Sequence, residues 1–169
     1  MDVTSVPGRR FGLTADTQDD LVDWPAVLTR LRTAWGAVDG VLHCGDISTM
    51  TALAGLGEAG PVFATRNNGD PPAAPPGLCD GPRLLEIGGV RVGLMFNLPK
   101  DAMTPTGAAA LFGGPVAACI FGGTHEPRLE QVGEVLFINP GSPSLAKRRT
   151  AAVLTIDDGR ASAQIVDVG

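Results

Sequence analysis

Residues 11–20 read FGLTADTQDD, an apolar run that ends at Asp16 and continues into amide and acidic side chains. The stretch from about Arg10 to Ala15 is typical of a short buried strand. Oxygen-bearing side chains at the end of such a strand indicate either a turn or a binding site. The rest of the chain can separate these interpretations, because neighbouring parallel strands bring their carboxyl ends to one edge of a sheet.

A helix is predicted directly after this strand. Asp23 is a good N-cap, and Pro25 falls in the first turn, where its missing N–H leaves no hydrogen bond unmade. Apolar residues then recur at helical spacing, namely Trp24, Val27, Leu28, Leu31 and Trp35. Short apolar runs at 40–44 and 62–65 flank a second helical segment at about 48–56. This order predicts β-α-β-α-β with parallel strands and right-handed crossovers.

The second half of the chain has a different pattern. Residues 71–83 are rich in proline and are expected to form an irregular loop. Strands are predicted at 84–87, 90–96, 117–121, 129–132, 135–138, 152–156 and 161–166, with a helix near 106–112. Gly88-Gly89 and Gly133-Glu134 are hairpin signals, so this half is expected to be largely antiparallel.

Size and composition favour one domain that spans residues 1–169. The hydrophobic fraction of the chain is 44%, which is enough for a substantial core in a protein of 169 residues. The formal net charge is −5, and the longest run of basic residues is Lys147 to Arg149. An acidic protein without a basic patch is not expected to bind nucleic acid or an anionic membrane as its main partner.

The expected compartment is the cytoplasm. Cys44, Cys79 and Cys119 are odd in number, widely spaced and free of any C-x-x-C pair, which favours reduced thiols. No signal peptide is predicted at the N-terminus, and the uncharged stretch 102–124 is interrupted by prolines and glycines. A membrane-spanning segment is therefore not predicted.

Polar side chains follow most of the predicted strands. They are Asp16, Asp46, Asn68, Asn97, His125 and Asn139. Each one alone is explained by the turn preference of Asp and Asn. Their joint recurrence at strand ends favours a shared site, and a set of carboxylates, amides and an imidazole suits a hard or borderline divalent metal.

Five short blocks in the chain resemble those of a known family. They are D-T-Q at 16–18, H-C-G-D at 43–46, R-N-N-G-D at 66–70, G-G-T-H at 122–125 and N-P-G-S at 139–142. In order and in position at strand ends they resemble the D-x-H, G-D, G-N-x-D, G-H-x-H and N-P-G-S blocks of the calcineurin-like metallophosphoesterases. The resemblance is to the small bacterial and archaeal phosphodiesterase branch and covers nearly the whole chain.

The resemblance implies an α/β fold, a four-layer αββα sandwich with mixed sheets, and a two-metal site that hydrolyses phosphate esters. The first ion would be held by Asp16, Gln18, Asp46 and His125. Gln18 stands where the family has the histidine of D-x-H, and its amide oxygen is a weaker metal ligand than imidazole. The expected cofactor is one divalent ion, Mn²⁺, Mg²⁺, Zn²⁺ or Fe.

The second ion is in doubt, because the resemblance implies a ligand set that this chain has half lost. Asp46 would bridge the two ions and Asn68 would bind the second, but the two histidine positions are occupied by Phe96 and Gly123. A further histidine of the family falls at Leu98. Asp46 and Asn68 are the residues predicted to take part in catalysis, with Asn68 orienting a phosphate oxygen.

Two functions remain open at the level of sequence. In the first, a single ion activates water, and the protein is a phosphodiesterase with a reduced, degenerate active site that acts on a small phosphate ester. In the second, the protein is an inactive binding or scaffold module with a protein or small-ligand partner. Sequence leaves the substrate, the metal and homo-oligomer formation undecided. His43 is expected to be a core residue, while Asp70 and Glu126 are unselected alternative oxygen ligands.

Overall fold

The predicted alternation of strand and helix builds one sheet of the computed structural model, which describes residues 1–169. In spatial order the strands of this sheet are β12 (Arg160–Asp167), β11 (Thr150–Asp157), β2 (Arg10–Thr14), β3 (Gly40–His43), β4 (Val62–Arg66) and β5 (Leu78–Asp80). β2, β3, β4 and β5 run parallel, and β11 and β12 are antiparallel to their neighbours. Pairing of Thr14 with His43, and of His43 with Ala64, aligns the carboxyl ends of three strands.

The second sheet contains most of the strands predicted in the later part of the chain. Its spatial order is β1 (Val3–Val6), β6 (Arg83–Ile87), β7 (Val90–Met95), β8 (Ala118–Phe121), β10 (Val135–Asn139) and β9 (Arg128–Val132). The two predicted hairpins, β6–β7 and β9–β10, are present and antiparallel. The centre of the sheet differs from the antiparallel expectation, since β7, β8 and β10 are parallel. A helical crossover between β7 and β8 accounts for the difference.

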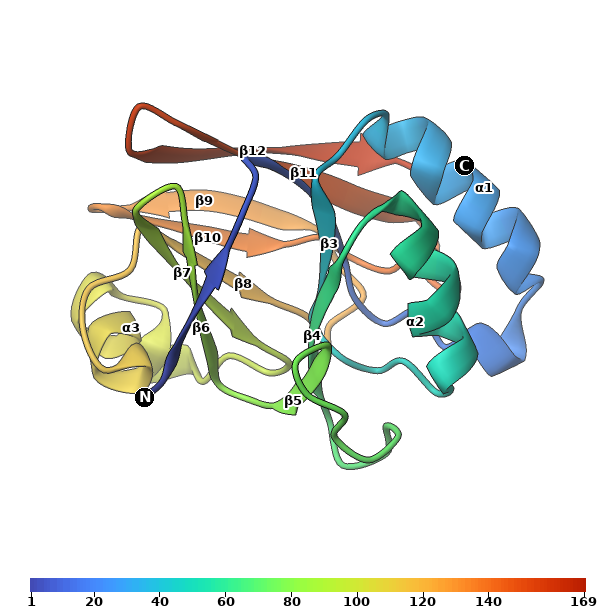
Figure 1. Cartoon of the computed structure of the whole chain (residues 1–169), viewed down its shortest axis with the longest axis horizontal. Helices are drawn as coiled ribbons and strands as arrows, with labels where there is room; N and C mark the ends of the chain where they lie inside the picture. The colour runs from blue at the N-terminus through green and yellow to red at the C-terminus, as the bar shows by residue number, and fades with distance from the viewer.

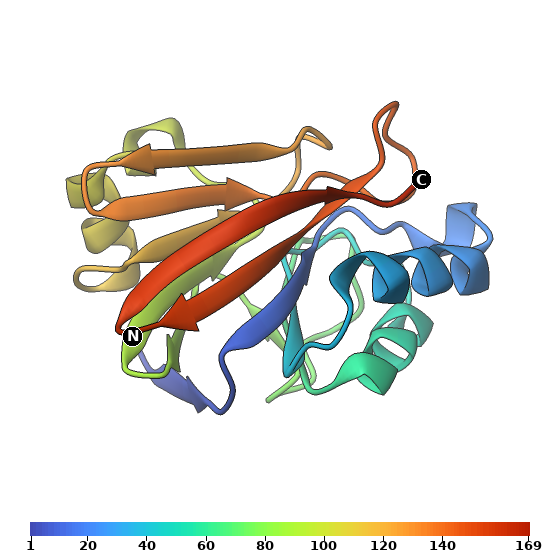
Figure 2. The same cartoon turned by 90° about the horizontal axis from the view of Figure 1, so that it is seen from above.

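Helices cover the outer face of each sheet, so the chain forms the predicted four-layer αββα sandwich (Figures 1 and 2). α1 (Trp24–Trp35) and α2 (Met50–Leu56) pack beside the first sheet, and α3 (Pro105–Phe112) packs beside the second. Short 3₁₀ turns lie at Asp19–Leu21, Gly57–Ala59 and Lys100–Ala102. No helix has the length and apolar character needed to span a membrane.

Three apolar layers hold these elements together. Eighteen buried residues lie between the two sheets, fifteen lie between the first sheet and α1 and α2, and eight lie between the second sheet and α3. α1 begins as predicted, because the Asp23 carboxylate accepts a hydrogen bond from the Ala26 N–H at 3.2 Å. Trp35 lies flat on β2 only because residue 12 is glycine, where a Cβ would be 2.5 Å from the indole ring. This packing fixes the strand that carries Asp16.

Two short strands were not predicted from the sequence. β1 (Val3–Val6) is largely exposed at the edge of its sheet, and β5 (Leu78–Asp80) lies inside the proline-rich loop. Edge strands bury little apolar surface, so their sequences show little of the periodicity by which strands are recognised. Neither strand moves the ends of β2, β3 and β4, where the polar residues gather.

Candidate metal centre

Backbone hydrogen bonds hold the loops after β2, β3 and β8 side by side. The Asp16 N–H donates to the Gly45 carbonyl oxygen at 2.9 Å, and the Gln18 N–H donates to the Asp46 carbonyl oxygen at 3.2 Å. From the other sheet, the Gly123 N–H donates to Asp16 Oδ2 at 2.9 Å. The edge where the two sheets meet therefore brings together three segments that are far apart in the sequence.

Asp16, Asp46 and His125 form one cluster at this edge. Each offers one ligand atom, and these atoms all lie within 4.8 Å of one another. His125 Nε2 is 3.7 Å from Asp16 Oδ1. Two carboxylates and an imidazole at such distances are suited to enclosing a divalent cation. The fold thus brings together three of the five residues that the sequence predicts as metal ligands.

The backbone at these positions is held in an unfavourable conformation. Asp16, Gln18, Asp46 and His125 have φ values of 51°, 42°, 61° and 61°, within the left-handed region. Only Ser48 and Asp158 share this feature among the non-glycine residues. Such conformations cost roughly 1–3 kcal/mol each and gather at functional sites. Four of the six non-glycine residues with this conformation are thus the candidate ligands of the first ion.

Gln18 has a buried oxygen without a partner. Its side chain is half-buried, and its Oε1 atom is inaccessible to solvent yet accepts no hydrogen bond. Leaving a buried amide oxygen unsatisfied costs roughly 1–3 kcal/mol, so such an atom calls for an explanation. A cation bound to Oε1 would remove this cost. The amide at position 18 therefore fits the role of an oxygen ligand to a metal.

The Asp16 carboxylate carries the main electrostatic cost of the cluster. Its side chain is fully buried, and this burial raises the pKa of Asp16 to about 6. The Gly123 hydrogen bond and His125 lower this pKa, whereas the charges of Asp46 and Asp70 raise it further. A buried carboxylate close to a second carboxylate lacks positive charge, and a divalent cation would supply it.

Asp70 supports the cluster without belonging to it. Its two oxygens accept hydrogen bonds from the backbone N–H groups of Asp46, Ile47 and Asn67 at 2.9, 2.7 and 3.0 Å. Both oxygens are therefore used in holding two loops together, and the alternative role of Asp70 as a metal ligand does not fit. Sequence reasoning missed this positioning role, because the three partners are backbone groups.

His43 is a core residue, as predicted. Its side chain is fully buried, with Nε2 at 3.0 Å from Thr17 Oγ1 and Nδ1 accepting from the Gly45 N–H at 3.0 Å. Burial lowers the pKa of His43 to about 4, so the ring is neutral at pH 7. It shapes the turn that leads to Asp46 and is not free to bind a metal.

Side chains in and just after the N-P-G-S block hold the loop after β2 in place. Ser142 Oγ donates to the Asp16 carbonyl oxygen at 2.8 Å, and Ser144 Oγ donates to the Thr17 carbonyl oxygen at 2.6 Å. Asn139 Nδ2 donates to Thr124 Oγ1 at 3.0 Å, next to His125. Asn139 and the two serines therefore position candidate ligands through backbone and side-chain contacts.

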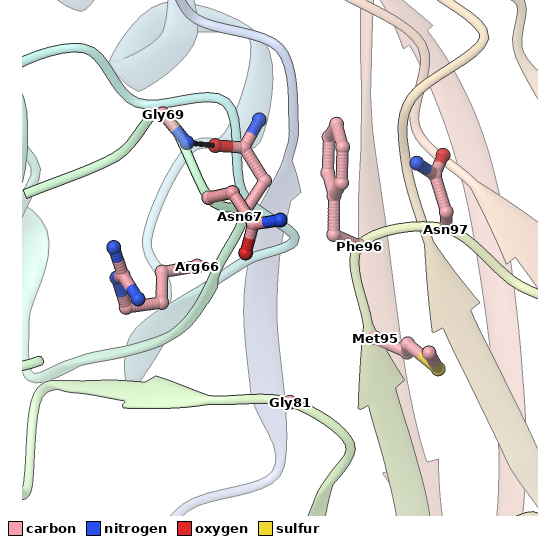
Figure 3. Close-up of a pocket in the computed structure, with 8 residues that line it drawn as sticks. Arg66, Asn67, Gly69, Gly81, Met95, Phe96 and Asn97 are labelled. Atoms are coloured by element: carbon pink, nitrogen blue, oxygen red, sulfur yellow. Dashed lines mark hydrogen bonds between the residues drawn. The ribbon is translucent and has the colours of Figure 1, made fainter.

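Of the two asparagines after β4, Asn68 is the one predicted as a metal ligand, but Asn67 is the one that contacts the cluster. Asn68 was predicted as a metal ligand, but its side chain is exposed and forms no hydrogen bond. The preceding Asn67 instead donates from Nδ2 to Asp46 Oδ1 at 3.2 Å. Both line a pocket of about 420 Å³ beside the cluster, in which Figure 3 shows Asn67. The role of Asn68 as a ligand stays a prediction.

Comparison with known proteins establishes the family. The family model for the calcineurin-like phosphoesterase superfamily domain matches residues 10–159. The chain belongs to the calcineurin-like phosphoesterase superfamily. The blocks that carry the resemblance in sequence all lie within the matched range and at the edge just described.

Two curated relatives of this superfamily come from archaea. A probable metallophosphoesterase of Methanocaldococcus jannaschii is 30% identical over 117 residues, which cover 65% of this chain and 56% of the relative. A probable metallophosphoesterase of Methanothermobacter thermautotrophicus is 29% identical over 143 residues, 80% of each protein. The matched stretch thus spans little more than half of the first relative.

Solved structures agree in fold. An archaeal phosphodiesterase has a TM-score of 0.70 and 22% identity, covering 92% of this chain and 99% of its own. The vacuolar protein sorting 29 protein of Chaetomium thermophilum has a TM-score of 0.72 and 14% identity, covering 93% and 95%. At these identities the likeness concerns the fold.

The second half of this phosphoesterase site is built differently from the first. The Phe96 ring packs against the loops of both Asp46 and His125: a Cβ on Gly45 would lie 2.8 Å from Phe96 Cδ2, and one on Gly123 would lie 3.5 Å from Phe96 Cζ. A side chain at residue 123 would also collide with Asn97 Oδ1. An apolar ring and a backbone that excludes a side chain do not fit a second metal ion.

Two further residues near this half of the site are committed to other contacts. Leu98 packs with the apolar cluster beneath α3. The Arg66 guanidinium donates to Asp80 Oδ1 at 2.9 Å and to the carbonyl oxygens of Asp70 and Pro71 at 3.0 and 2.7 Å. Arg66 therefore adds no free positive charge to the pocket that it lines.

Proposed function

We propose that this chain is a phosphodiesterase that depends on a single divalent metal ion. The cluster of Asp16, Asp46 and His125, with ligand atoms within 4.8 Å of one another, is the observation that carries the proposal. The unpartnered Gln18 Oε1 supports a fourth ligand from the same strand end. Membership of the phosphoesterase superfamily supplies the reaction class.

A divalent ion in this site supplies Lewis acidity and lowers the pKa of a coordinated water. The carboxylates of Asp16 and Asp46 would provide the negative charge that retains such an ion, and His125 would provide an imidazole nitrogen. Asp70 and Asn67 fix the direction of the Asp46 carboxylate through the hydrogen bonds described above. The exposure of Asn68 in the adjoining pocket supports a role in which its amide N–H donates to a phosphate oxygen.

The balance of charge favours a diester over a monoester. Two carboxylates and one divalent ion sum to zero, and the guanidinium of Arg66, which lines the pocket with Asn68, is already paired with Asp80. A phosphate diester carries one negative charge, whereas a monoester carries close to two at neutral pH. On the side of Asn68 the site thus offers little extra positive charge to a dianionic substrate.

The proposal is tested by cleavage of bis(p-nitrophenyl) phosphate with Mn²⁺, Mg²⁺, Zn²⁺ or Fe²⁺ supplied in turn. We expect metal-dependent turnover that falls at least about 100-fold in Asp46→Asn. Asp158→Asn is the matched control, because Asp158 is an exposed aspartate with a similar left-handed backbone, in the turn between β11 and β12. Equal inactivity of the wild type and Asp46→Asn with every metal would reject the proposal.

The second candidate function is a non-catalytic binding module in the cytoplasm. It is favoured by one observation, the replacement of two expected metal-binding histidines by Phe96 and Gly123. Structures named for vacuolar protein sorting share the fold with a phosphodiesterase, so this fold is found under both descriptions. Inactivity with every metal, together with retained folding, would lead to this function and to a search for a protein partner.

A further inference from the structure

A pocket of about 420 Å³ adjoins the metal centre on the side where a second ion is not accommodated. One wall is the loop after β4, with Asn67 and Asn68, and the other is the end of β7 and the loop after it, with Phe96 and Asn97. Figure 3 shows Asn67 and Phe96 on these two walls. Asn67 also contacts Asp46 through its amide. The pocket is therefore joined to the metal centre at Asp46, and an ester group of a phosphate bound there has room in it.

The pocket carries no free charge. Arg66 is its one charged lining residue, and the guanidinium of Arg66 is satisfied by Asp80 and by two backbone carbonyl oxygens. The pocket beside His125 differs, since it is lined by Lys147, Arg148 and Glu126. A neutral ester group is therefore matched to the pocket at Phe96, and a charged one is not.

Phe96 provides a flat apolar surface in this pocket. The ring is half-buried and packs against Gly45 and Gly123, so its position is fixed by the same turns that carry Asp46 and His125. Planar heterocycles such as nucleobases stack on aromatic rings of this kind, whichever base is present. An aliphatic group would gain the apolar contact without the stacking.

Two amides beside the ring are unused by the protein. Asn68 and Asn97 are both exposed in the pocket, and neither side chain forms a hydrogen bond within the protein. Amide side chains present a donor and an acceptor together, which matches the paired donor and acceptor on the edge of a nucleobase. Gly69 and Gly81 line the same pocket without side chains and leave room for a ring.

We propose that this pocket binds a nucleobase, so that the substrate is a phosphodiester with a nucleoside arm. The inference rests on the proposed function for the position of the phosphate, but the base-binding pocket itself is defined by Phe96, Asn68 and Asn97. Where a two-metal phosphoesterase would place its second ion, this chain binds an organic group of its substrate.

The test compares adenosine with methyl riboside, two neutral probes that differ by the base and that contain no phosphodiester to be hydrolysed. Dissociation constants are measured by ligand-observed NMR on the Zn²⁺-equilibrated protein. We expect adenosine to bind at least tenfold more tightly than methyl riboside. In Phe96→Leu, which keeps an apolar residue but removes the ring, the preference is expected to fall below about threefold.

Asn97→Ala provides a second variant that does not disturb the core, because Asn97 is exposed, and it is expected to lower the preference as well. Gln131→Ala removes an exposed amide on β9 and is the matched control that keeps the full preference. Equal binding of both probes by the wild type, or a preference that survives Phe96→Leu, would overturn the inference. Turnover of bis(p-nitrophenyl) phosphate by the same preparations reports on the proposed function separately.

Discussion

The two halves of the site meet at Asp46 and differ in the groups that they can bind. Asp16, Gln18, Asp46 and His125 share a left-handed backbone and a lack of compensating positive charge. On the other side of Asp46, Phe96 packs on two glycines. The first half offers buried ligand atoms without a compensating cation, and the second half is filled by packing. Because each half is supported by its own contacts, a change in one half need not disturb the other.

The largest expected effect is a loss of activity and of the bound ion when a ligand of the first half is removed. His125→Ala removes an imidazole from the cluster of three ligands and is expected to lower phosphodiesterase activity by at least about 100-fold, with loss of the bound ion. Asn68→Ala removes an exposed amide from the other half and is expected to cost about tenfold in activity with the ion retained. Elemental analysis and steady-state kinetics check both. Equal loss of the ion in both variants would remove the distinction between the halves.

Asp70→Asn tests whether the first half depends on its supporting contacts. The variant keeps one oxygen where two now accept three backbone hydrogen bonds. We expect metal affinity to fall about 10–100-fold and stability to fall by about 1–3 kcal/mol. Titration calorimetry and denaturant unfolding measure these quantities.

Asp80→Asn serves as the control for that measurement. Asp80 is an exposed carboxylate paired with Arg66, with 74% of its side chain accessible. Its loss is expected to change stability by at most about 1 kcal/mol and to leave metal affinity unaltered. An equal fall in metal affinity in both variants would contradict a specific positioning role for Asp70.

Gln18→His is expected to raise the metal affinity, whereas Asp70→Asn lowers it. The change replaces an unpartnered amide oxygen by an imidazole, a stronger ligand for Zn²⁺ and related metals. We expect metal affinity to rise about tenfold with no change in the number of ions bound. A competition titration against a metal chelator measures the affinity. Unchanged affinity would mean that residue 18 is not a ligand.

The pKa of Asp16 predicts how pH acts on the first half. In the folded protein this pKa is raised to about 6, above the usual value of an aspartate in the unfolded chain. The folded state therefore binds the proton of Asp16 more tightly than the unfolded state does. The stability of the metal-free protein should fall as pH rises from about 4 to 6, and Asp16 should cause little further change in stability above pH 6.

A bound cation competes with the same proton. Metal affinity should consequently fall about tenfold for each pH unit below about 6, as one proton has to be displaced. Thermal melts of metal-free protein across this range, and metal titrations beside them, measure the two trends. In Asp16→Asn the stability trend should disappear. Its persistence there would assign it to another group.

Much of the fold could be predicted from the sequence because its signals are local. Asp23 and Pro25 mark the start of α1, and short apolar runs mark β2, β3 and β4. The strands β1 and β5 could not be found, since they are short and lie at sheet edges. Parallel pairing in the centre of the second sheet was also missed, because the hairpin signals describe only β6–β7 and β9–β10.

The sequence pattern pointed to three residues that lie together in the structure, and it missed the contacts that position them. Polar residues at strand ends point to Asp16, Asp46 and His125, which the structure places in one cluster. The roles of Asp70 and Ser142 depend on hydrogen bonds to backbone groups of distant loops, which leave no pattern in sequence. The contact of the Phe96 ring with Gly45 and Gly123 likewise depends on packing between loops.

Metal stoichiometry is the most direct test of a site with one functional half. The protein would be purified without an affinity tag, equilibrated with Mn²⁺ or Zn²⁺, freed of loosely held metal and subjected to elemental analysis beside Asp46→Asn. We predict about one tightly bound ion per chain, lost in the variant. Two tightly bound ions would contradict the inference that Phe96 and Gly123 leave no place for a second ion. The absence of any ion would contradict metal binding by Asp16, Asp46 and His125.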